Sequence, residues 1–252
     1  MTILEVNGLK KIYSTRFGGN KVEALKNVNF SVEQGEYVAI MGESGSGKTT
    51  LLNILAALDK PTEGNVILDG NNLSKLKESQ ISAFRRDNLG FVFQDFNLLD
   101  TFTLEDNIYL PLVLAGMPYK KMHDRLMTIA ECLGISALLK KYPYEVSGGQ
   151  KQRLLITRAL AKHPQILVLD DSSSALDYAT DARLRRAIQE NYGDLTSIIV
   201  AQRISSIYRA DKIIVLEDGE MIGYGTHKEL MESCEVYREI SQSQMGGGID
   251  EA

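Results

Sequence analysis

The chain has 252 residues, of which 28 are basic and 33 acidic, so its formal net charge is −5. Its 44% hydrophobic and 24% charged content is ordinary for a globular protein and excludes disordered, collagen-like and disulfide-framework classes. The mildly acidic balance predicts no nucleic-acid partner, and no apolar run approaches the roughly 18 residues that span a bilayer. Residues 1–6 show no basic head followed by an apolar stretch, so we expect no signal peptide and a cytoplasmic protein.

The first part of the chain is predicted to be rich in strands. Residues 22–32 alternate imperfectly, and residues 37–41 form a continuous apolar run, as a buried strand does. A glycine-rich loop follows, and then a helix that carries apolar residues over 51–55. Two further short strands are expected over 65–68 and 89–93.

The pattern becomes helical from about residue 103 to residue 160. Strands are then expected again at three places, which are 166–169, 196–200 and 212–216. A helical stretch over 178–190 separates the first two, and Asp218-Gly219 indicates a hairpin after the last. Because strands and helices alternate, we predict an α/β fold with a parallel sheet.

One loop fits the pattern G-x-x-x-x-G-K-[ST], in which backbone N–H groups converge on phosphate oxygens at the start of a helix. It follows a predicted buried strand and precedes a predicted helix, as that mechanism requires. Its Lys48 would reach the β- and γ-phosphates of a nucleotide, and the Thr49 hydroxyl would bind Mg²⁺. The alternative is a flexible glycine turn without a ligand. The loop consists of Gly42, Glu43, Ser44, Gly45, Ser46, Gly47, Lys48 and Thr49.

Two carboxylates follow the apolar strand over 166–169, namely Asp170 and Asp171. An aspartate at this place can hold Mg²⁺ through water, and the next residue can face an attacking water. Acids end many buried strands, so the signal is weak alone. Beside the phosphate loop it predicts a second nucleotide-binding element.

A further glycine-containing stretch, Ser147-Gly148-Gly149-Gln150, lies at a predicted helix start. Such a stretch is usually a turn with a helix N-cap. No strand precedes it, so as a phosphate loop it makes sense only if it addresses the nucleotide of another subunit.

Together these motifs resemble the nucleotide-binding domain of ATP-binding cassette (ABC) proteins, and the resemblance covers nearly the whole chain. It implies that residues 42–49, with the adjoining Thr50, form the Walker A loop for ATP, and that Asp170 is the Walker B carboxylate. It implies that Ser147, Gly148, Gly149 and Gln150 are the family signature, which acts in trans across a head-to-tail dimer.

The resemblance gives roles to three more positions. Tyr13 lies where the family stacks an aromatic ring on adenine, although a plain strand aromatic is the alternative. Gln94 matches a glutamine that touches Mg²⁺ and couples to the membrane partner, and Asp177 belongs to a loop that crosses the dimer interface.

The two halves of the chain resemble different branches of the family. Residues 1 to about 153 resemble ATPases of lipoprotein-release, macrolide-efflux and antimicrobial-peptide-resistance transporters, with cues such as Leu58-Asp59. Residues from about 154 onward resemble the impaired half of a heterodimeric multidrug exporter, because Asp171 replaces a glutamate and Gln202 replaces a histidine. The mismatch suggests a chimera joined near residues 150–156, and a natural mosaic is the alternative.

We therefore expect an ABC-type ATPase with an α/β core and β subdomain over 1–96 and 156–252, and a helical subdomain over 97–155. Hydrolysis is expected to be slow, and the expected catalytic residues are Asp171, Gln202 and Gln94. The expected cofactors are ATP and Mg²⁺, and the metal ion would be held by Thr49, Gln94 and Asp170. The partners would be a second ABC subunit, identical or not, and a membrane permease that holds the chain at the inner face of the cell membrane. The rival functions are a nucleotide-gated dimerisation module with little turnover and a soluble ABC ATPase without transport.

Overall fold

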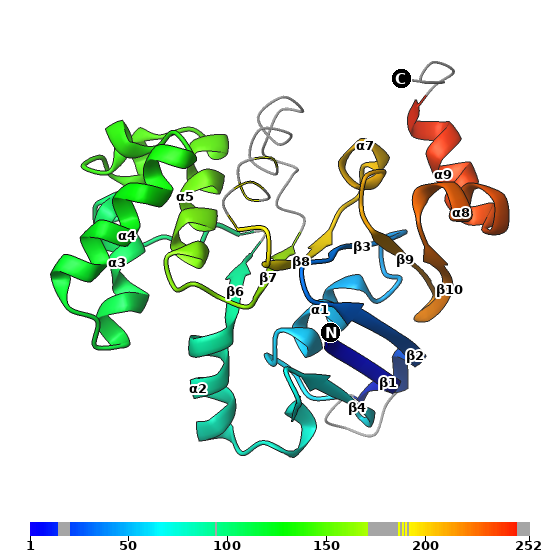
Figure 1. Ribbon diagram of the computed structural model, residues 1–252. Helices are drawn as coiled ribbons and strands as arrows, with labels where there is room; N and C mark the ends of the chain where they lie inside the picture. The colour runs from blue at the N-terminus through cyan, green and yellow to red at the C-terminus, as the bar shows by residue number, and fades with distance from the viewer. Residues whose placement is uncertain are drawn as a thin grey trace. The chain divides into compact units, whose positions relative to one another are not determined.

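The computed structural model describes residues 1–14, 21–93, 95–170, 186, 188, 190 and 192–245. The chain divides into two compact units (Figure 1). The first unit comprises Met1–Ile81 and Thr196–Ala252, and the second comprises Ser82–Leu195. The predicted helix over 178–190 lies largely outside the described residues, as do Gln94, Asp171 and Asp177.

An antiparallel sheet in the first unit has the strand order β2-β1-β4-β5. Leu4 of β1 lies opposite Val32 of β2 on one side and opposite Leu68 of β4 on the other. All three side chains are almost fully buried, so this face of the sheet contributes to the core. The strands are β1 (Thr2–Ser14), β2 (Lys21–Glu33), β4 (Glu63–Leu68) and β5 (Asn71–Asn72).

The central strand of the first unit is β3 (Tyr37–Gly42), which is paired in parallel with β8 (Thr196–Val200) and β9 (Lys212–Glu217). The side chains over 38–41 are at most 1% exposed, which explains their continuous apolar character. Strand β10 (Glu220–Gly225) returns antiparallel to β9. Asp218 and Gly219 have φ of 45° and 81°, so the predicted two-residue hairpin is confirmed.

Short helices complete the first unit. Helix α1 (Lys48–Leu55) follows β3 and buries its apolar residues, as predicted, and the C-terminal segment ends in α8 (His227–Ser233) and α9 (Glu235–Met245). These two C-terminal helices go beyond the elements predicted from the sequence. The remaining helices are η1 (Leu73–Lys75) and α7 (Ile204–Ile207), and α2 (Glu78–Asn88) begins in the first unit and ends in the second.

The second unit combines a parallel strand pair with helices. Strand β6 (Leu89–Val92) pairs with β7 (Ile166–Asp170). Leu104, Leu126 and Leu154 lie on three different helices and are at most 1% exposed, so the helices share a buried apolar core. The predicted change to helical structure after residue 103 is thus confirmed. The helices are α3 (Leu104–Leu114), α4 (Tyr119–Cys132), η2 (Ser136–Leu138), η3 (Pro143–Glu145) and α5 (Gly148–Leu160).

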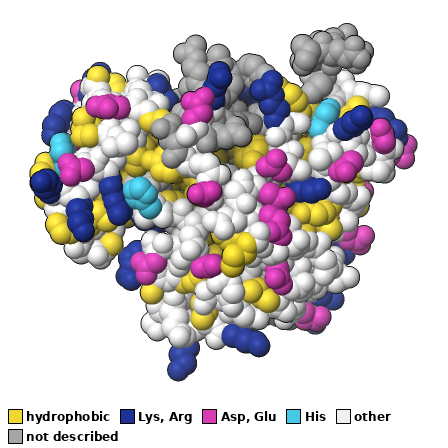
Figure 2. All heavy atoms as spheres, in the orientation of Figure 1, with side chains coloured by type: hydrophobic (Ala, Val, Ile, Leu, Met, Phe, Trp, Pro, Cys, Tyr) yellow, Lys and Arg dark blue, Asp and Glu magenta, His cyan; other side chains and the backbone are white. Residues whose placement is uncertain are grey.

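The described surface carries both signs of charge. Figure 2 shows Lys and Arg side chains interspersed with Asp and Glu side chains on the face that it draws. Within the described ranges, no helix combines the length and apolar character needed to cross a membrane. The expected class, an α/β fold with an antiparallel sheet and a helical part, is confirmed, whereas the boundaries of the helical subdomain at 97 and 155 stay a prediction.

Candidate nucleotide-binding site

The loop between β3 and α1 has a backbone that only glycine allows at two positions. Gly42 has φ of 150°, and a Cβ added there would lie 2.0 Å from the carbonyl oxygen of Leu216. Gly47 has φ of 100°, and its Cβ would lie 2.5 Å from the carbonyl oxygen of Ala24. Both glycines are therefore required by close backbone approach, and the interpretation as a merely flexible turn is wrong for them.

The start of α1 presents backbone N–H groups without side-chain caps. Gly47 is the N-cap residue and has no side chain to accept a hydrogen bond, and the first turn carries no acidic residue. The first N–H groups of a helix have no partner within the helix, and the helix dipole places positive charge at this end. This arrangement favours a phosphate group.

Two side chains of the loop also favour the binding of an anion. Lys48 Nζ donates hydrogen bonds to the carbonyl oxygens of Gly42, at 2.9 Å, and of Glu43, at 2.6 Å. These bonds hold the ammonium group against the loop itself. Ser46 is 3% exposed, and its hydroxyl has no hydrogen-bond partner among the described residues. A buried unpaired hydroxyl is costly, so it is a reason to expect a ligand at this loop.

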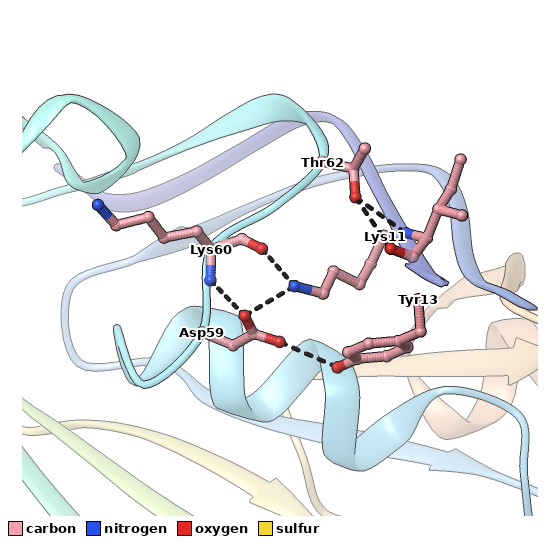
Figure 3. Close-up of polar contacts among 6 residues, drawn as sticks. Lys11, Tyr13, Asp59, Lys60 and Thr62 are labelled. Atoms are coloured by element: carbon pink, nitrogen blue, oxygen red, sulfur yellow. Dashed lines mark hydrogen bonds and ion pairs between the residues drawn. The ribbon is translucent and has the colours of Figure 1, made fainter. Parts of the chain in front are cut away.

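Tyr13 lies near the end of β1 and is held by polar contacts (Figure 3). Its hydroxyl donates to Asp59 Oδ2 at 2.9 Å, and Lys11 Nζ lies 4.9 Å from the centroid of its ring. Lys11 Nζ also donates to Asp59 Oδ1 at 2.7 Å, which makes an ion pair. The residue remains 42% exposed. Tyr13 is therefore an exposed aromatic surface in a defined orientation.

The contacts of Asp59 and Lys11 were not predicted from the sequence. Leu58-Asp59 gave only a cue to a family branch, because the partners lie 46 and 48 residues away along the chain. No local pattern signals such a contact. Pairing of β1 with β4 brings the two segments together, since Thr62, just before β4, accepts a hydrogen bond from Ile12 N.

The stretch Ser147–Gln150 begins α5 as a reciprocal cap. Ser147 Oγ accepts a hydrogen bond from Gln150 N at 3.4 Å, and Gln150 Oε1 accepts one from Ser147 N at 2.9 Å. This confirms the helix N-cap. Ser147 and Gly148 are exposed, and the nearest atom to a Cβ added at Gly148 is Phe96 Cζ at 3.8 Å. The cap thus lies open on its own unit.

The remaining predicted site residues are only partly described. Asp170 is the last residue of β7 and is half-buried. Gln202 follows β8 and is exposed, and its carbonyl oxygen accepts a hydrogen bond from Gln244 Nε2 at 2.7 Å. Gln94, Asp171 and Asp177 lie outside the described residues. Within the described ranges, no group of three or more His, Cys, Asp and Glu residues is placed to hold a metal ion.

The described geometry defines a phosphate-loop nucleotide-binding protein: a buried parallel strand, a glycine loop required by close packing, and an uncapped helix start. The family model for ABC transporters matches residues 25–174, which is more than half of the chain. The chain therefore belongs to the ABC transporter family and is an ABC-type ATPase.

Several curated relatives match most of the chain. The bacitracin export ATP-binding protein BceA of Halalkalibacterium halodurans is 40% identical over 224 residues, covering 88% of this chain and 87% of that protein. The uncharacterized ABC transporter ATP-binding protein YvcR of Bacillus subtilis is 37% identical over 258 residues, covering 100% of this chain and 98% of that protein.

A solved structure shares the fold. It is described as the dimeric structure of a post-hydrolysis state of the ATP-binding cassette MJ0796 bound to ADP and Pi, and the relative of that name comes from Methanocaldococcus jannaschii. The TM-score is 0.82 with 35% sequence identity, and the match covers 89% of this chain and 99% of that one. The predicted fold and family are confirmed.

Proposed function

We propose that the chain is the ATP-binding and hydrolysing subunit of an export-type ABC transporter, which closes as a head-to-tail dimer on ATP and drives a separate membrane permease. The observation that carries this proposal is the loop before α1, in which two glycines are required by packing and the helix start is uncapped. The name of one relative, the bacitracin export ATP-binding protein BceA, supports the export type. The chain would then lie at the inner face of the membrane, through its permease.

ATP binding rests on the loop and on Tyr13. The N–H groups at the start of α1 and the ammonium group of Lys48 stabilise the charge on the phosphates, and the Tyr13 ring stacks on the base. Phosphoryl transfer to water needs positioning and electrostatic stabilisation rather than a covalent intermediate. The ATP-binding residues in this proposal are Tyr13, Gly42, Glu43, Ser44, Gly45, Ser46, Gly47, Lys48, Thr49 and Thr50.

The donor chemistry of three residues fits Mg²⁺. The Thr49 hydroxyl, the Asp170 carboxylate and the Gln94 side-chain oxygen are hard oxygen donors of the kind that Mg²⁺ prefers. When bound, the Mg²⁺ ion would neutralise negative charge on the phosphates. Asp171 would orient the attacking water, and Gln202 would contact the γ-phosphate in place of a histidine.

The signature stretch supports a dimer. Ser147, Gly148, Gly149 and Gln150 form a helix start at which Ser147 and Gly148 are exposed, and a helix start is suited to an anion. Asp177 would contribute at the same interface. MJ0796, whose solved structure is described as dimeric, supports this arrangement.

A nucleotide-gated dimerisation module with little turnover is the second candidate, because Asp171 and Gln202 depart from the residues of active ATPases.

The substitution Lys48→Ala tests the proposal. We expect it to weaken binding of a fluorescent ATP analogue and to abolish phosphate release, because it removes the charge that faces the phosphates. Lys75→Ala is the matched control, since it removes an exposed lysine of the same unit that lies outside the loop. Equal ATP affinity and equal turnover in the parent and in Lys48→Ala would contradict the assignment of the loop.

The transport role needs its own experiment. Affinity purification of the tagged chain from its source membranes is expected to recover a membrane permease. Recovery of soluble partners alone would favour an ABC ATPase without transport. ATP-dependent dimers with no measurable phosphate release would favour the dimerisation module.

A further inference from the structure

The two oxygens of the Asp59 carboxylate accept hydrogen bonds from different groups (Figure 3). Oδ1 accepts hydrogen bonds from Lys11 Nζ and from the backbone N–H of Lys60, both at 2.7 Å. Lys11 Nζ also donates to the carbonyl oxygen of Lys60 at 2.7 Å. Oδ2 accepts from the Tyr13 hydroxyl at 2.9 Å. One oxygen therefore ties the loop after α1 to strand β1, and the other fixes the end of the Tyr13 ring.

The protonation states of the pair set the direction of the bond. Burial alone would raise the pKa of the Asp59 carboxyl, but hydrogen bonds from Lys11, Tyr13 and the Lys60 amide outweigh it and hold the pKa below its ordinary value. Burial raises the pKa of the Tyr13 phenol and Asp59 raises it further, and together they outweigh a side-chain hydrogen bond with Thr50 that lowers it. At neutral pH the carboxylate can only accept, so the phenol donates.

The Lys11 ammonium group completes the support of the ring. It lies 4.9 Å from the ring centroid, within the range of a cation–π contact, and the Lys11 side chain is only 12% exposed. The ammonium group thus occupies one face of the Tyr13 ring. Because Tyr13 is still 42% exposed, surface remains for a flat ligand.

An exposed tyrosine without such an anchor would rotate among staggered rotamers and would have to be ordered when a base stacks on it. Ordering a side chain on binding costs about two- to tenfold in affinity. The polar contacts of Tyr13 remove this cost before the nucleotide arrives.

We propose that Asp59 is a positioning residue for the nucleobase: its Oδ2 holds Tyr13 as a pre-ordered stacking surface, with Lys11 under the ring. This inference rests on the proposed ATP-binding function and deepens it. It assigns to Asp59 a contribution to the affinity for the base part of the nucleotide that leaves the affinity for the phosphates unchanged.

A double-mutant cycle on the full chain tests the inference. Tyr13→Phe keeps the ring and removes the hydroxyl, and Asp59→Ala removes the carboxylate. Alanine is chosen over asparagine because an asparagine Nδ2 would donate to the Tyr13 hydroxyl oxygen and keep a hydrogen bond there. Both single variants and the combined variant are titrated with ATP and with inorganic tripolyphosphate, which has no base. Glu23→Gln is the matched control, because Glu23 is a carboxylate of the same sheet that pairs with Lys10 at 2.9 Å.

We expect each single variant to bind ATP about two- to tenfold more weakly than the parent, as for a side chain that must be ordered on binding. Their affinity for tripolyphosphate should equal that of the parent. The combined variant should bind ATP no more weakly than Asp59→Ala, because the hydrogen bond lost in Tyr13→Phe is already absent there. Glu23→Gln should match the parent with both ligands.

Three results would overturn the inference. Parental ATP affinity in Tyr13→Phe would mean that the hydroxyl anchor has no effect on binding. A fully additive combined variant would mean that Asp59 acts by another route. An equal loss of ATP and tripolyphosphate affinity would indicate local damage to the phosphate loop. If the parent itself binds neither ligand, the proposed ATP-binding function fails first, so the two failures are distinguishable.

Discussion

Asp171 and Gln202 stand at the two positions where the resemblance to active ABC ATPases implies a glutamate and a histidine. Aspartate is one methylene shorter than glutamate, which retracts its carboxylate by roughly 1 Å, and such a displacement can cost about a hundredfold in rate. A glutamine amide cannot accept and return a proton as imidazole does, and a positioned acid–base group contributes about 10² to 10⁴ in rate.

We therefore expect Asp171→Glu with Gln202→His to hydrolyse ATP faster than the parent, by about a hundredfold if the carboxylate limits the rate. The double variant should exceed either single variant, because the two groups act together on one reaction. Steady-state phosphate release from the four proteins measures this. A double variant that binds ATP normally and turns over no faster than the parent would show that these residues do not limit the enzyme.

At the scale of elements, helix α9 reaches the segment that carries Gln202. The Gln244 side chain donates from Nε2 to the Gln202 carbonyl oxygen and accepts at Oε1 from the Ile204 N–H, at 2.7 Å and 2.8 Å. Arg203, the N-cap residue of α7, supplies no side-chain cap. Gln244 therefore caps α7 from a distant part of the chain, and Tyr237, at 0% exposed, anchors the same helix in the core.

The substitution Gln244→Ala should expose the Ile204 amide to solvent exchange. A helix cap contributes about 1 kcal/mol, which corresponds to about fivefold faster exchange of that amide. Hydrogen exchange followed by NMR at Ile204 provides the measurement. Gln242→Ala is the matched control, because Gln242 is exposed on the same helix. Unchanged Ile204 exchange in Gln244→Ala would contradict the cap.

At the scale of the whole molecule, the open helix start of α5 leads us to expect dimers that depend on ATP. Light scattering of the Asp171→Asn variant with ATP and EDTA should give a mass near twice that of the monomer, because hydrolysis is then blocked. The same sample without ATP should remain a monomer.

Gly148→Asp sharpens this experiment. An acidic residue in the first turn of α5 favours the helix but repels a phosphate, and only Phe96 lies within 4 Å of a Cβ at this position. Added to the Asp171→Asn background, it should keep parental ATP affinity and lose the dimer. Two results would argue against contact between the signature of one subunit and the nucleotide of the other. One is that Asp171→Asn stays monomeric with ATP, and the other is that it still dimerises after Gly148→Asp is added.

The chimera is a separate question about the whole molecule. YvcR of Bacillus subtilis aligns over 100% of this chain at 37% identity, so one relative spans both halves. The comparisons give no support to a junction near residues 150–156, and the chimera stays a prediction from the motifs alone.

The sequence by itself determined the features that depend on neighbours along the chain. The Ser147–Gln150 cap and the Asp218-Gly219 hairpin are each set by backbone preferences and hydrogen bonds that reach only a few residues. The phosphate loop over 42–49 is recognisable from its local pattern, although the close packing of Gly42 and Gly47 against Leu216 and Ala24 is tertiary. Buried strands also follow directly from continuous apolar runs. For this reason the sequence alone indicates the α/β class, and its motifs indicate the family.

Only the tertiary structure decided the contacts between distant segments. Asp59 meets Tyr13 across 46 residues, and Gln244 meets Gln202 across 42 residues. A polar side chain has many partners available along the chain, and the pairing of strands and packing of helices select the one that lies within hydrogen-bond distance. The support of the Tyr13 ring and the cap on α7 therefore became visible only in the folded molecule.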